Sequence, residues 1–529
     1  MKITLLNLFE SPFDNAVAAA RTCYSGKGVV TPAQVAGGAS ATAASGAAVD
    51  PDAARARASE RKHHLAASVY KAGHHTTLQH AHAQFAMEGV SRQFIWSFLH
   101  AHPFYNSEQV SQRYVTVTPD QVYLPEGLTP AQRDIYLTGV GRQMADYESL
   151  TERLVPLAEA EYLKLFPARR GSKRATRDVQ KKAQEVARYV LPLGTTAYLY
   201  HTVSLITLFR YRRMADHFDT PVEQRRVVEE MVRQVLAFDP DLEALVEDPL
   251  PLEETPEYAL MQQLGGSHAR SNTFLDEFDA RLDGRTSRLV DWSARGESVM
   301  ADAVREVLGL PKDALSDADA VAAVMDPSRN RWLGETMNLK LHGKLSRAMV
   351  HPHYTFAKKL SHTADSQDQR HRMTPASRPV MAAHVTDRPD YITPRLFEED
   401  AGAYAAYAES MARTWDSVAR LKAAGASDEA AHYLLPNALA IRFTESGDLS
   451  ALHHKMAMRL CYNAQEEIWQ ASLDEAGQIR DVHPAIGRFL LPPCGLRDLS
   501  GTRPVCPEGD RYCGVKVWKL DLADYRRVI

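Results

Sequence analysis

The sequence predicts an α+β protein built from two tandem copies of one domain, each with a mixed sheet and long helices. Its 529 residues are too many for a single ordinary hydrophobic core. The motif His-x-His-x-x-Phe-Ala occurs at 80–86 and again at 351–357, which is 271 residues later. VARYVLPL (186–193) and AAHYLLPN (430–437) follow in the same order in the two halves. Ordered matches of this kind indicate an internal duplication.

The elements of the first copy follow from local patterns of apolar residues. ITLLNL (3–8) predicts a short buried strand, and an alanine-rich helix is predicted at 15–25. Residues 31–50 lack large apolar side chains and cannot bury enough surface to offset ordering, so a mobile loop is predicted. A further helix is predicted at 52–71. Longer helical patterns occupy 128–165, 174–192 and 220–237.

The second copy opens at 287–306, whose strand and helix pattern resembles the beginning of the chain. Further helices are predicted at 403–423 and 450–475. Between the copies, 247–272 is rich in proline and contains a Gly-Gly pair, which indicates a domain boundary. The predicted organisation is a first domain at 1–245, a linker at 246–284, a second domain at 285–475 and a C-terminal extension at 476–529.

Composition excludes several classes of protein. Hydrophobic residues make up 45% of the chain and charged residues 24%, as in ordinary globular proteins. The net charge of −4 gives no general attraction for nucleic acid or membranes, so neither partner is expected. No apolar run is long enough for a membrane helix, and the N-terminus lacks a secretory signal pattern. Five cysteines form no disulfide framework, which makes the cytoplasm the expected compartment.

Four motifs of the first half are recognisable together. They are AARTCYS (19–25), GHHTTLQHAHAQFAMEGVSRQF (73–94), SQRYV (111–115) and ARYVLP (187–192). Their order and spacing across about 1–235 resemble the flavin-dependent thymidylate synthase family. The second half resembles it less closely but holds QDQRHR (367–372) and LHHKMAMRLCYNAQEEI (452–468). The resemblance implies two tandem copies of this family's fold.

One family signature, Arg-His-Arg-x-x-Ser-x-Asn-x-x-Ser-x-Arg-Tyr, is divided between the halves. The first half retains only its end, at 109–114, and has His100-Ala101-His102 where the arginines are expected. The second half retains Arg370-His371-Arg372 but is too short afterwards to supply the rest. Members of the family are tetramers with sites between subunits, so the resemblance implies that a duplicated chain can build one site from both halves. The reciprocal losses predict such a composite site.

The resemblance implies a role for each retained residue. The implied catalytic residues are Arg113, Arg370 and Arg459. The implied substrate-binding residues are Gln109, Ser111, Arg113, Arg188, Gln367 and Arg370. The implied cofactor-binding residues are Thr76, Arg370, His371 and Arg372. Arginine suits these roles because its planar guanidinium binds phosphate oxygens in a bidentate manner and stabilises the anionic edge of a reduced flavin.

The resemblance also implies the reaction. The family methylates deoxyuridylate (dUMP) to thymidylate (dTMP) with FAD, takes the carbon from methylene-tetrahydrofolate and uses NADPH as reductant. No protein nucleophile is implied, so the protein's part is placement and electrostatics. The expected assembly is a homodimer equivalent to the family's tetramer.

Two other functions remain open from the sequence. One is a catalytically silent homologue that binds nucleotide or flavin as a sensor or scaffold. It is favoured by departures from the family pattern, such as Gln79 in place of a glutamate and VSLIT (203–207) in place of an Asn-x-Arg motif. The other is a flavin enzyme that methylates a different pyrimidine, such as a base in RNA. The net charge and the absence of a basic stripe weigh against it.

A further cluster lies outside the duplication. Cys494, Cys506 and Cys513 lie among prolines and glycines, and with His483 they could hold a structural zinc ion. Their spacing matches no standard zinc module, so buried or incidental thiols are the alternative.

Overall fold

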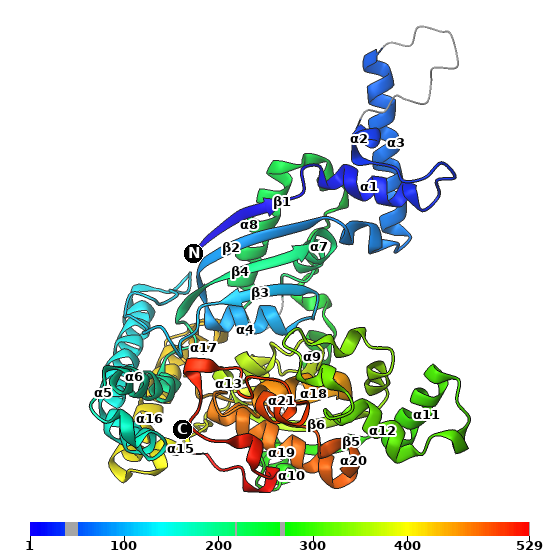
Figure 1. Ribbon diagram of the computed structural model, residues 1–529. Coiled ribbons are helices and arrows are strands. Elements are labelled where there is room, and N and C mark those ends of the chain that lie inside the picture. Colours follow the sequence, from blue (N-terminus) through cyan, green and yellow to red (C-terminus); the bar gives the residue numbers. More distant parts are fainter. Residues whose placement is uncertain (37–50, 217–219, 265–269, 528–529) are drawn as a thin grey trace.

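Two four-stranded sheets organise the protein, one in each half of the chain (Figure 1). The structure, a computed structural model, describes residues 1–36, 51–216, 220–264 and 270–527. The first sheet has the order β1-β2-β4-β3, with β1 Lys2–Leu8, β2 His82–Ser91, β3 Tyr105–Gln109 and β4 Thr196–Ser204. The second has the order β5-β6-β8-β7, with β5 Ser287–Trp292, β6 His353–Ser361, β7 Ala376–Ser377 and β8 Ala440–Asp448. The shared order is consistent with tandem copies of one domain.

Every pair of neighbouring strands in these sheets is antiparallel, so the predicted mixed sheet is wrong. Along β2 and β4, buried residues alternate with more exposed ones, which means that one face of the first sheet is covered and the other is more open. Antiparallel sheets tolerate an open face, whereas parallel sheets are covered on both sides by crossover helices.

Most predicted helices of the first half are present. The helices are α1 Pro12–Thr22, α2 Pro32–Ala36, α3 Pro51–Lys71, α4 Arg92–His100, α5 Pro130–Leu165, α6 Lys173–Ala187, α7 Leu205–Arg213 and α8 Pro221–Phe238. The predicted loop at 31–50 begins with α2, and its remainder at 37–50 lies outside the described residues. The predicted helix at 174–192 ends early, because Pro192 favours an extended conformation at Leu191.

The second half follows the same plan. Its helices are α11 Gly296–Leu308, α12 Asp317–Met325, α13 His362–Asp368, α14 Met381–His384, α15 Arg395–Glu398, α16 Ala401–Ala423, α17 Asp428–His432, α18 Leu449–Arg459 and α19 Glu466–Val482. The region between the halves contains α9 (Pro256–Leu264) and α10 (Asn272–Leu282), and the C-terminal extension contains α20 (Pro484–Gly487) and α21 (Pro493–Leu499). The single helix predicted at 450–475 is two helices, because Gln465 caps a new start by accepting the Ile468 N–H.

The repeated His-x-His motif leads into the same strand in both halves. β2 begins at His82 and β6 at His353, with the offset of 271 residues seen in the sequence. Each strand ends in a serine that caps the next helix. Ser91 accepts the Phe94 N–H at the start of α4, and Ser361 accepts the Ala364 N–H at the start of α13. The duplicated sequence therefore produces the same strand–cap–helix unit twice.

The two halves are joined by main-chain hydrogen bonds between the second pair of repeated motifs. Leu193 N–H donates to the Leu435 carbonyl and Asn437 N–H donates to the Leu191 carbonyl, both at 2.8 Å. Pro192 and Pro436 face each other at the centre of this antiparallel bridge. We call the segments 189–194 and 433–438 the bridging segments. They connect the halves in the way that two strands pair within a sheet.

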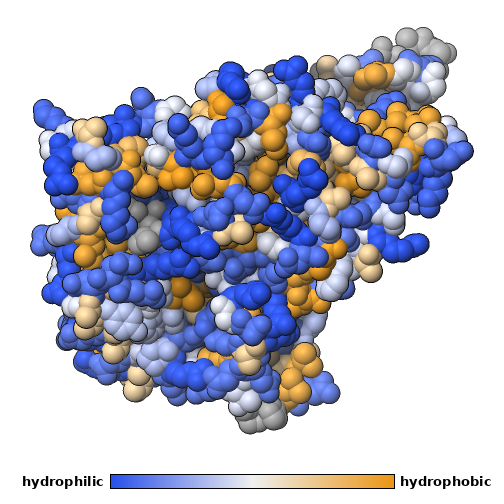
Figure 2. Space-filling model, turned by 60° about the horizontal axis from the view of Figure 1, so that its bottom comes forward, coloured by the Kyte–Doolittle hydropathy of each residue, from blue (hydrophilic) through white to orange (hydrophobic). Residues whose placement is uncertain are grey.

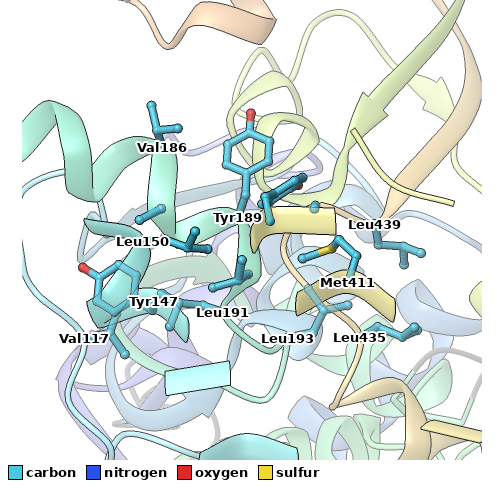
Figure 3. Close-up of a cluster of buried hydrophobic side chains, with 14 of the residues drawn as sticks. Val117, Tyr147, Leu150, Val186, Tyr189, Leu191, Leu193, Met411, Leu435 and Leu439 are labelled. Carbon is cyan, nitrogen blue, oxygen red and sulfur yellow. The ribbon is translucent and has the colours of Figure 1, made fainter. Parts of the chain in front are cut away.

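A hydrophobic core forms around the bridging segments and belongs to both halves. Leu191 and Leu193 are fully buried and share one cluster with Met411, Leu435 and Leu439 of the second half. Figure 3 shows these side chains directed toward one another from elements of both halves. α5 of the first half packs along α16 of the second over the same core (Figure 1). Burial of this shared apolar surface is the main force that holds the halves together.

Two matching hydrogen-bond networks cross between the halves. In one, Glu223 of α8 accepts from the Ser91 hydroxyl at 2.6 Å and from the Tyr433 hydroxyl of the second half at 2.8 Å. In the other, Glu467 of α19 accepts from the hydroxyls of Ser361 and of Tyr189, a residue of the first half. Both glutamates are buried. Each network ties the cap at the end of a central strand to a tyrosine of the opposite bridging segment.

The outer surface is largely polar. The face in Figure 2 mixes hydrophilic residues with smaller hydrophobic patches. Within the described segments, none of the helices combines the length and apolar character needed to span a membrane.

Removing one tyrosine hydroxyl from either network should weaken the union of the halves. Tyr433→Phe and Tyr189→Phe each delete a donor to a buried carboxylate, which costs about 1.5–3 kcal/mol. We expect a lower thermal midpoint for each variant in differential scanning calorimetry. Tyr200→Phe, whose side chain is exposed on β4, is the matched control. Thermal midpoints equal to that of the control would show that the networks do not contribute to the stability of the folded protein.

Stability should also depend on the ionisation of Glu223. Burial raises its pKa from 4.5 to about 7, so the folded protein holds this proton more firmly than the unfolded chain. The associated stability is present below the unfolded pKa and is lost as the pH rises through 7. Glu223→Gln should therefore gain thermal midpoint relative to wild type between pH 5 and 8. An exposed control, Glu159→Gln, should show a pH-independent difference, and the same result for Glu223→Gln would contradict the assignment.

Candidate active site between the two halves

A cavity of about 780 Å³ lies between the first and the second half. One wall is formed by β3, from Tyr105 to Gln109, and by Leu99 at the end of α4. The opposite wall combines the turn at 370–374 with α18 and the segment around Lys340. A volume of this size is typical of sites for cofactors and other small molecules. Sequence segments more than 250 residues apart therefore enclose one space.

β3 delivers Gln109 to the cavity because it pairs with β4 and so extends the first sheet toward the second half. The Gln109 side chain accepts a hydrogen bond from Arg92 Nη1 at 3.0 Å, which fixes its orientation. Arg92 is buried, and burial together with the charge of Arg188 lowers its pKa to about 9. The Gln109 end of this wall is therefore held by a buried, positively charged guanidinium.

The turn after α13 carries two arginines that bind across the cavity to the first half. Arg370 Nη2 lies 2.6 Å from the Glu108 carboxylate. Arg372 donates to the Pro103 carbonyl at 3.1 Å and to the Asn106 side chain at 3.3 Å. These contacts connect the retained Arg-His-Arg of one half with the residues before the retained Ser-x-Arg of the other.

Arg459, at the end of α18, meets the same turn. Its Nε donates to His371 Nε2 at 2.8 Å and its Nη2 to the Gln367 carbonyl at 2.9 Å. Burial and the charges of Arg459 and Lys455 hold the pKa of His371 well below its usual value, so the ring is neutral. Since the Arg459 Nε–H is a donor only, the proton of His371 lies on Nδ1.

The arginines of this region are close enough to influence one another. Burial lowers the pKa of Arg459 to about 10, and the charges of Arg370 and Arg113 act in the same direction against that of Asp368. A concentration of positive charge that the protein only partly neutralises favours an anionic ligand.

Arg113 and Arg188 stand behind the cavity wall. Arg113 Nε lies 2.8 Å from the Glu185 carboxylate, and its Nη2 donates to the Asn463 carbonyl at 2.8 Å. Arg188 is buried, and its Nε and one Nη have no hydrogen-bond acceptor in the described part of the chain. Burial lowers the pKa of Arg188, and the nearby carboxylates of Glu185 and Glu467 act in the opposite direction, so its charge is partly compensated within the protein.

Comparison with known proteins identifies the family. The family model described as thymidylate synthase complementing protein matches residues 4–241 and 288–485. The chain belongs to the family of flavin-dependent thymidylate synthases. The flavin-dependent thymidylate synthase of Clostridium tetani (strain Massachusetts / E88) is 25% identical over 244 residues, which are 46% of this chain and 85% of that protein. That of Mycobacterium marinum is 28% identical over 182 residues, or 32% of this chain and 64% of that protein.

The cavity gathers five of the residues that the family resemblance singled out. They are Gln109, Arg370, His371, Arg372 and Arg459. The other implied residues are outside its lining. Ser111 accepts the Arg113 N–H, and the Gln367 side chain donates back to the Thr363 carbonyl of its own helix. Thr76 lies exposed in the turn η1 (His75–Gln79), beside α1 and α7 of the first half.

One charged residue at the cavity of this flavin-dependent thymidylate synthase family member could not be found from the sequence. Lys340 lines the cavity and is buried, with Nζ bonded to the Ser450 carbonyl at 2.9 Å and to His453 Nδ1 at 3.2 Å. Burial lowers its pKa to about 7 against the charge of Asp448. Lys340 comes from an irregular stretch that carries no family motif. Comparison of the two halves of the sequence does point to Asp448 and Ser450, because they occupy the second-half counterpart of the VSLIT motif (203–207).

The structure does not assemble the predicted zinc ligands as a set. Cys494, Cys506 and Cys513 line one small pocket, but His483 lies elsewhere, with Nδ1 2.8 Å from the Tyr354 hydroxyl. In the described ranges, no three histidine, cysteine, aspartate or glutamate side chains stand in an arrangement that could hold a metal ion. His483 is therefore removed from the predicted ligands, because it does not line the pocket that the three cysteines share.

Proposed function

We propose that the chain is a flavin-dependent thymidylate synthase that converts dUMP to dTMP with FAD, methylene-tetrahydrofolate and NADPH. The observation that carries this proposal is the composite cavity. Gln109 from the first half and Arg370 and Arg459 from the second line the same space. Each half supplies residues that the other has lost, and five of the ten implied residues line this one space.

The residues present fit an anionic flavin cofactor. Arg370 and Arg372 would provide positive charge at the edge of FAD, with the neutral ring of His371 between them. FAD supplies hydride transfer when it is bound. Thr76 lies outside the cavity of its own chain, so it would reach the cofactor only from the second chain of the proposed homodimer.

The side chains around dUMP would bind and orient it without attacking it. Gln109, Arg370 and Arg459 line the cavity and would contact dUMP, whereas Arg113, Arg188, Ser111 and Gln367 lie outside its lining and would reach the nucleotide only after a rearrangement. Arg459 would stabilise negative charge that develops on the pyrimidine ring, since neutral His371 accepts its Nε–H and keeps the guanidinium in place.

Arginine substitutions in the cavity should weaken nucleotide binding. Arg370→Ala and Arg459→Ala each remove a charge-assisted contact worth about 1.5–3 kcal/mol, or roughly 10- to 100-fold in affinity. Isothermal titration of dUMP into the flavin-loaded protein measures the loss. Arg142→Ala, on the exposed side of α5, is the matched control. Binding and turnover by Arg370→Ala equal to the control would rule out the composite site.

The chain should hold one FAD and one dUMP, not two of each. In the first half, His102 stands where the second half has an arginine; it packs on Phe104 and accepts its N–H, and burial lowers its pKa to about 4. A neutral histidine does not replace the guanidinium of an arginine in binding an anion, so a second, equivalent site is not expected.

Flavin released on denaturation, divided by protein concentration, gives the cofactor stoichiometry. We expect a value near one per chain, and a value near two would refute the assignment of a single site. Formation of dTMP from dUMP, methylene-tetrahydrofolate and NADPH separates the enzyme from the alternative of a silent binding homologue. The silent homologue would bind flavin and nucleotide and form no dTMP.

A further inference from the structure

One end of the cavity between the halves contains a buried lysine that has no carboxylate partner. Among the described residues, three lysines are buried, namely Lys340, Lys358 and Lys455. A carboxylate oxygen lies 2.6 Å from the Nζ of Lys358, and another lies 2.6 Å from that of Lys455. Lys340 lines the cavity, and no carboxylate of the described residues stands within 4.0 Å of its Nζ. Because lysine is almost never fully buried without a partner, a ligand is the expected source of the missing counter-ion.

The groups around Lys340 leave hydrogen-bond donors unused. An ammonium group has three hydrogens, and the described chain provides two acceptors, the Ser450 carbonyl at 2.9 Å and His453 Nδ1 at 3.2 Å. Ser450 also lines the cavity, and its side chain is only 3% exposed, yet its hydroxyl has no hydrogen-bond partner among the described residues. Asn338 lines the same end, with Nδ2 3.4 Å from His454 Nδ1. Lys340, Ser450 and Asn338 can therefore each donate to a ligand.

This end of the cavity is separate from the end that holds the arginines. α18 runs along the wall, with Ser450 in its first turn and Arg459 as its last residue. Nine residues of α-helix rise about 14 Å, which separates the contact of Lys340 with Ser450 from the contact of Arg459 with His371. The cavity thus has guanidinium groups at one end and a single ammonium group at the other.

The charges near Lys340 suit a singly charged anion. Asp448 also lines this end, and its negative charge acts on Lys340 from beyond ion-pair distance. Burial and the charge of Lys340 lower the pKa values of His453 and His454, so both rings are neutral. A phosphate monoester carries nearly two charges at neutral pH and would be repelled by Asp448, whereas a carboxylate carries one. Of the reactants in the proposed function, methylene-tetrahydrofolate is the one whose charged groups are carboxylates.

We propose that Lys340, with Ser450 and Asn338 beside it, binds a carboxylate of the folate substrate at the end of the cavity away from the arginines. The inference rests on the proposed function, because that function supplies the folate. The ligand provides the counter-ion that Lys340 lacks, and no covalent step is involved. Lys340 would then determine the affinity for folate, while the arginines determine the affinity for nucleotide and flavin.

Isothermal titration with 5-formyl-tetrahydrofolate, a stable folate with the same carboxylates, tests the proposal on the flavin-loaded protein with dUMP. Lys340→Met should weaken its binding by about 10- to 100-fold, because a charge-assisted contact is lost. Lys344→Met is the matched control, since Lys344 is exposed in the same stretch and does not line the cavity. A tetrahydropterin that lacks the glutamate part should bind Lys340→Met and the control equally.

Proton uptake by wild-type protein gives a readout that does not depend on the folding of a variant. Burial lowers the pKa of Lys340 to about 7, so at pH 8 its amine is mostly neutral until a carboxylate binds and draws a proton onto it. Titrations at pH 8 in two buffers of different ionisation enthalpy should show uptake of nearly one proton, and affinity should fall as the pH rises above 7. Lys340→Arg keeps the charge and should bind folate without this uptake. Asp448, His453 and His454 are the other titratable groups facing Lys340, and uptake that persists in Lys340→Met would assign the proton to one of them and overturn the inference.

Other results would also overturn the inference. They are folate binding by Lys340→Met equal to that of Lys344→Met, wild-type binding without proton uptake, and a wild-type protein that does not bind the folate. A loss of dUMP or FAD affinity in Lys340→Met with unchanged folate affinity would make this a phosphate site instead. The proposed function fails by a different result, the absence of dTMP formation by wild-type protein. Folate binding that still depends on Lys340 would in that case leave the carboxylate site in place.

Discussion

The antiparallel pairing of the two bridging segments is the constraint on which the rest of the structure depends. Main-chain hydrogen bonds on both sides of Pro192 and Pro436 fix the register between the halves. Backbone pairing is directional, whereas the surrounding contacts among Leu191, Leu435 and their neighbours are not. The apolar core thus supplies most of the attraction, and the bridge decides the geometry. That geometry brings β3 of the first half opposite the Arg-His-Arg turn of the second.

The two Ser–Glu–Tyr networks extend the effect of this pairing to the two sheets. Each links a strand end and a helix of one half to a tyrosine of the other, so both sheets are held at a defined position relative to the bridge. Burying a carboxylate is expensive unless several donors satisfy it, and both Glu223 and Glu467 receive three or more hydrogen bonds. Such polar groups favour one arrangement over others of similar hydrophobic burial.

The halves share a fold but differ beneath the cavity. In the second half, Lys358 and Lys455 lie among Asp368, Glu445 and Glu475, all of them buried. At corresponding positions the first half has aromatic residues, and Phe98, His201 and Tyr211 pack together. A buried ionic network adds little net stability, but it holds its members in fixed directions. The main-chain carbonyl of Asp368 accepts the His371 N–H, so the network lies directly before the Arg-His-Arg turn that the first half has lost.

The sequence by itself determined the family, the duplication and the long helices. The patterns at 128–165 and 403–423 match α5 and α16 closely, because a helix with one apolar face is recognisable without its partner. Strand pairing and the site were decided only by tertiary structure. The sheet that was expected to be mixed is antiparallel. Gln109 and Arg370 line the same cavity only because the bridging segments pair. Lys340 reaches the cavity from a stretch without a motif, since contacts between distant segments arise from packing of the whole chain and leave no local periodicity to read.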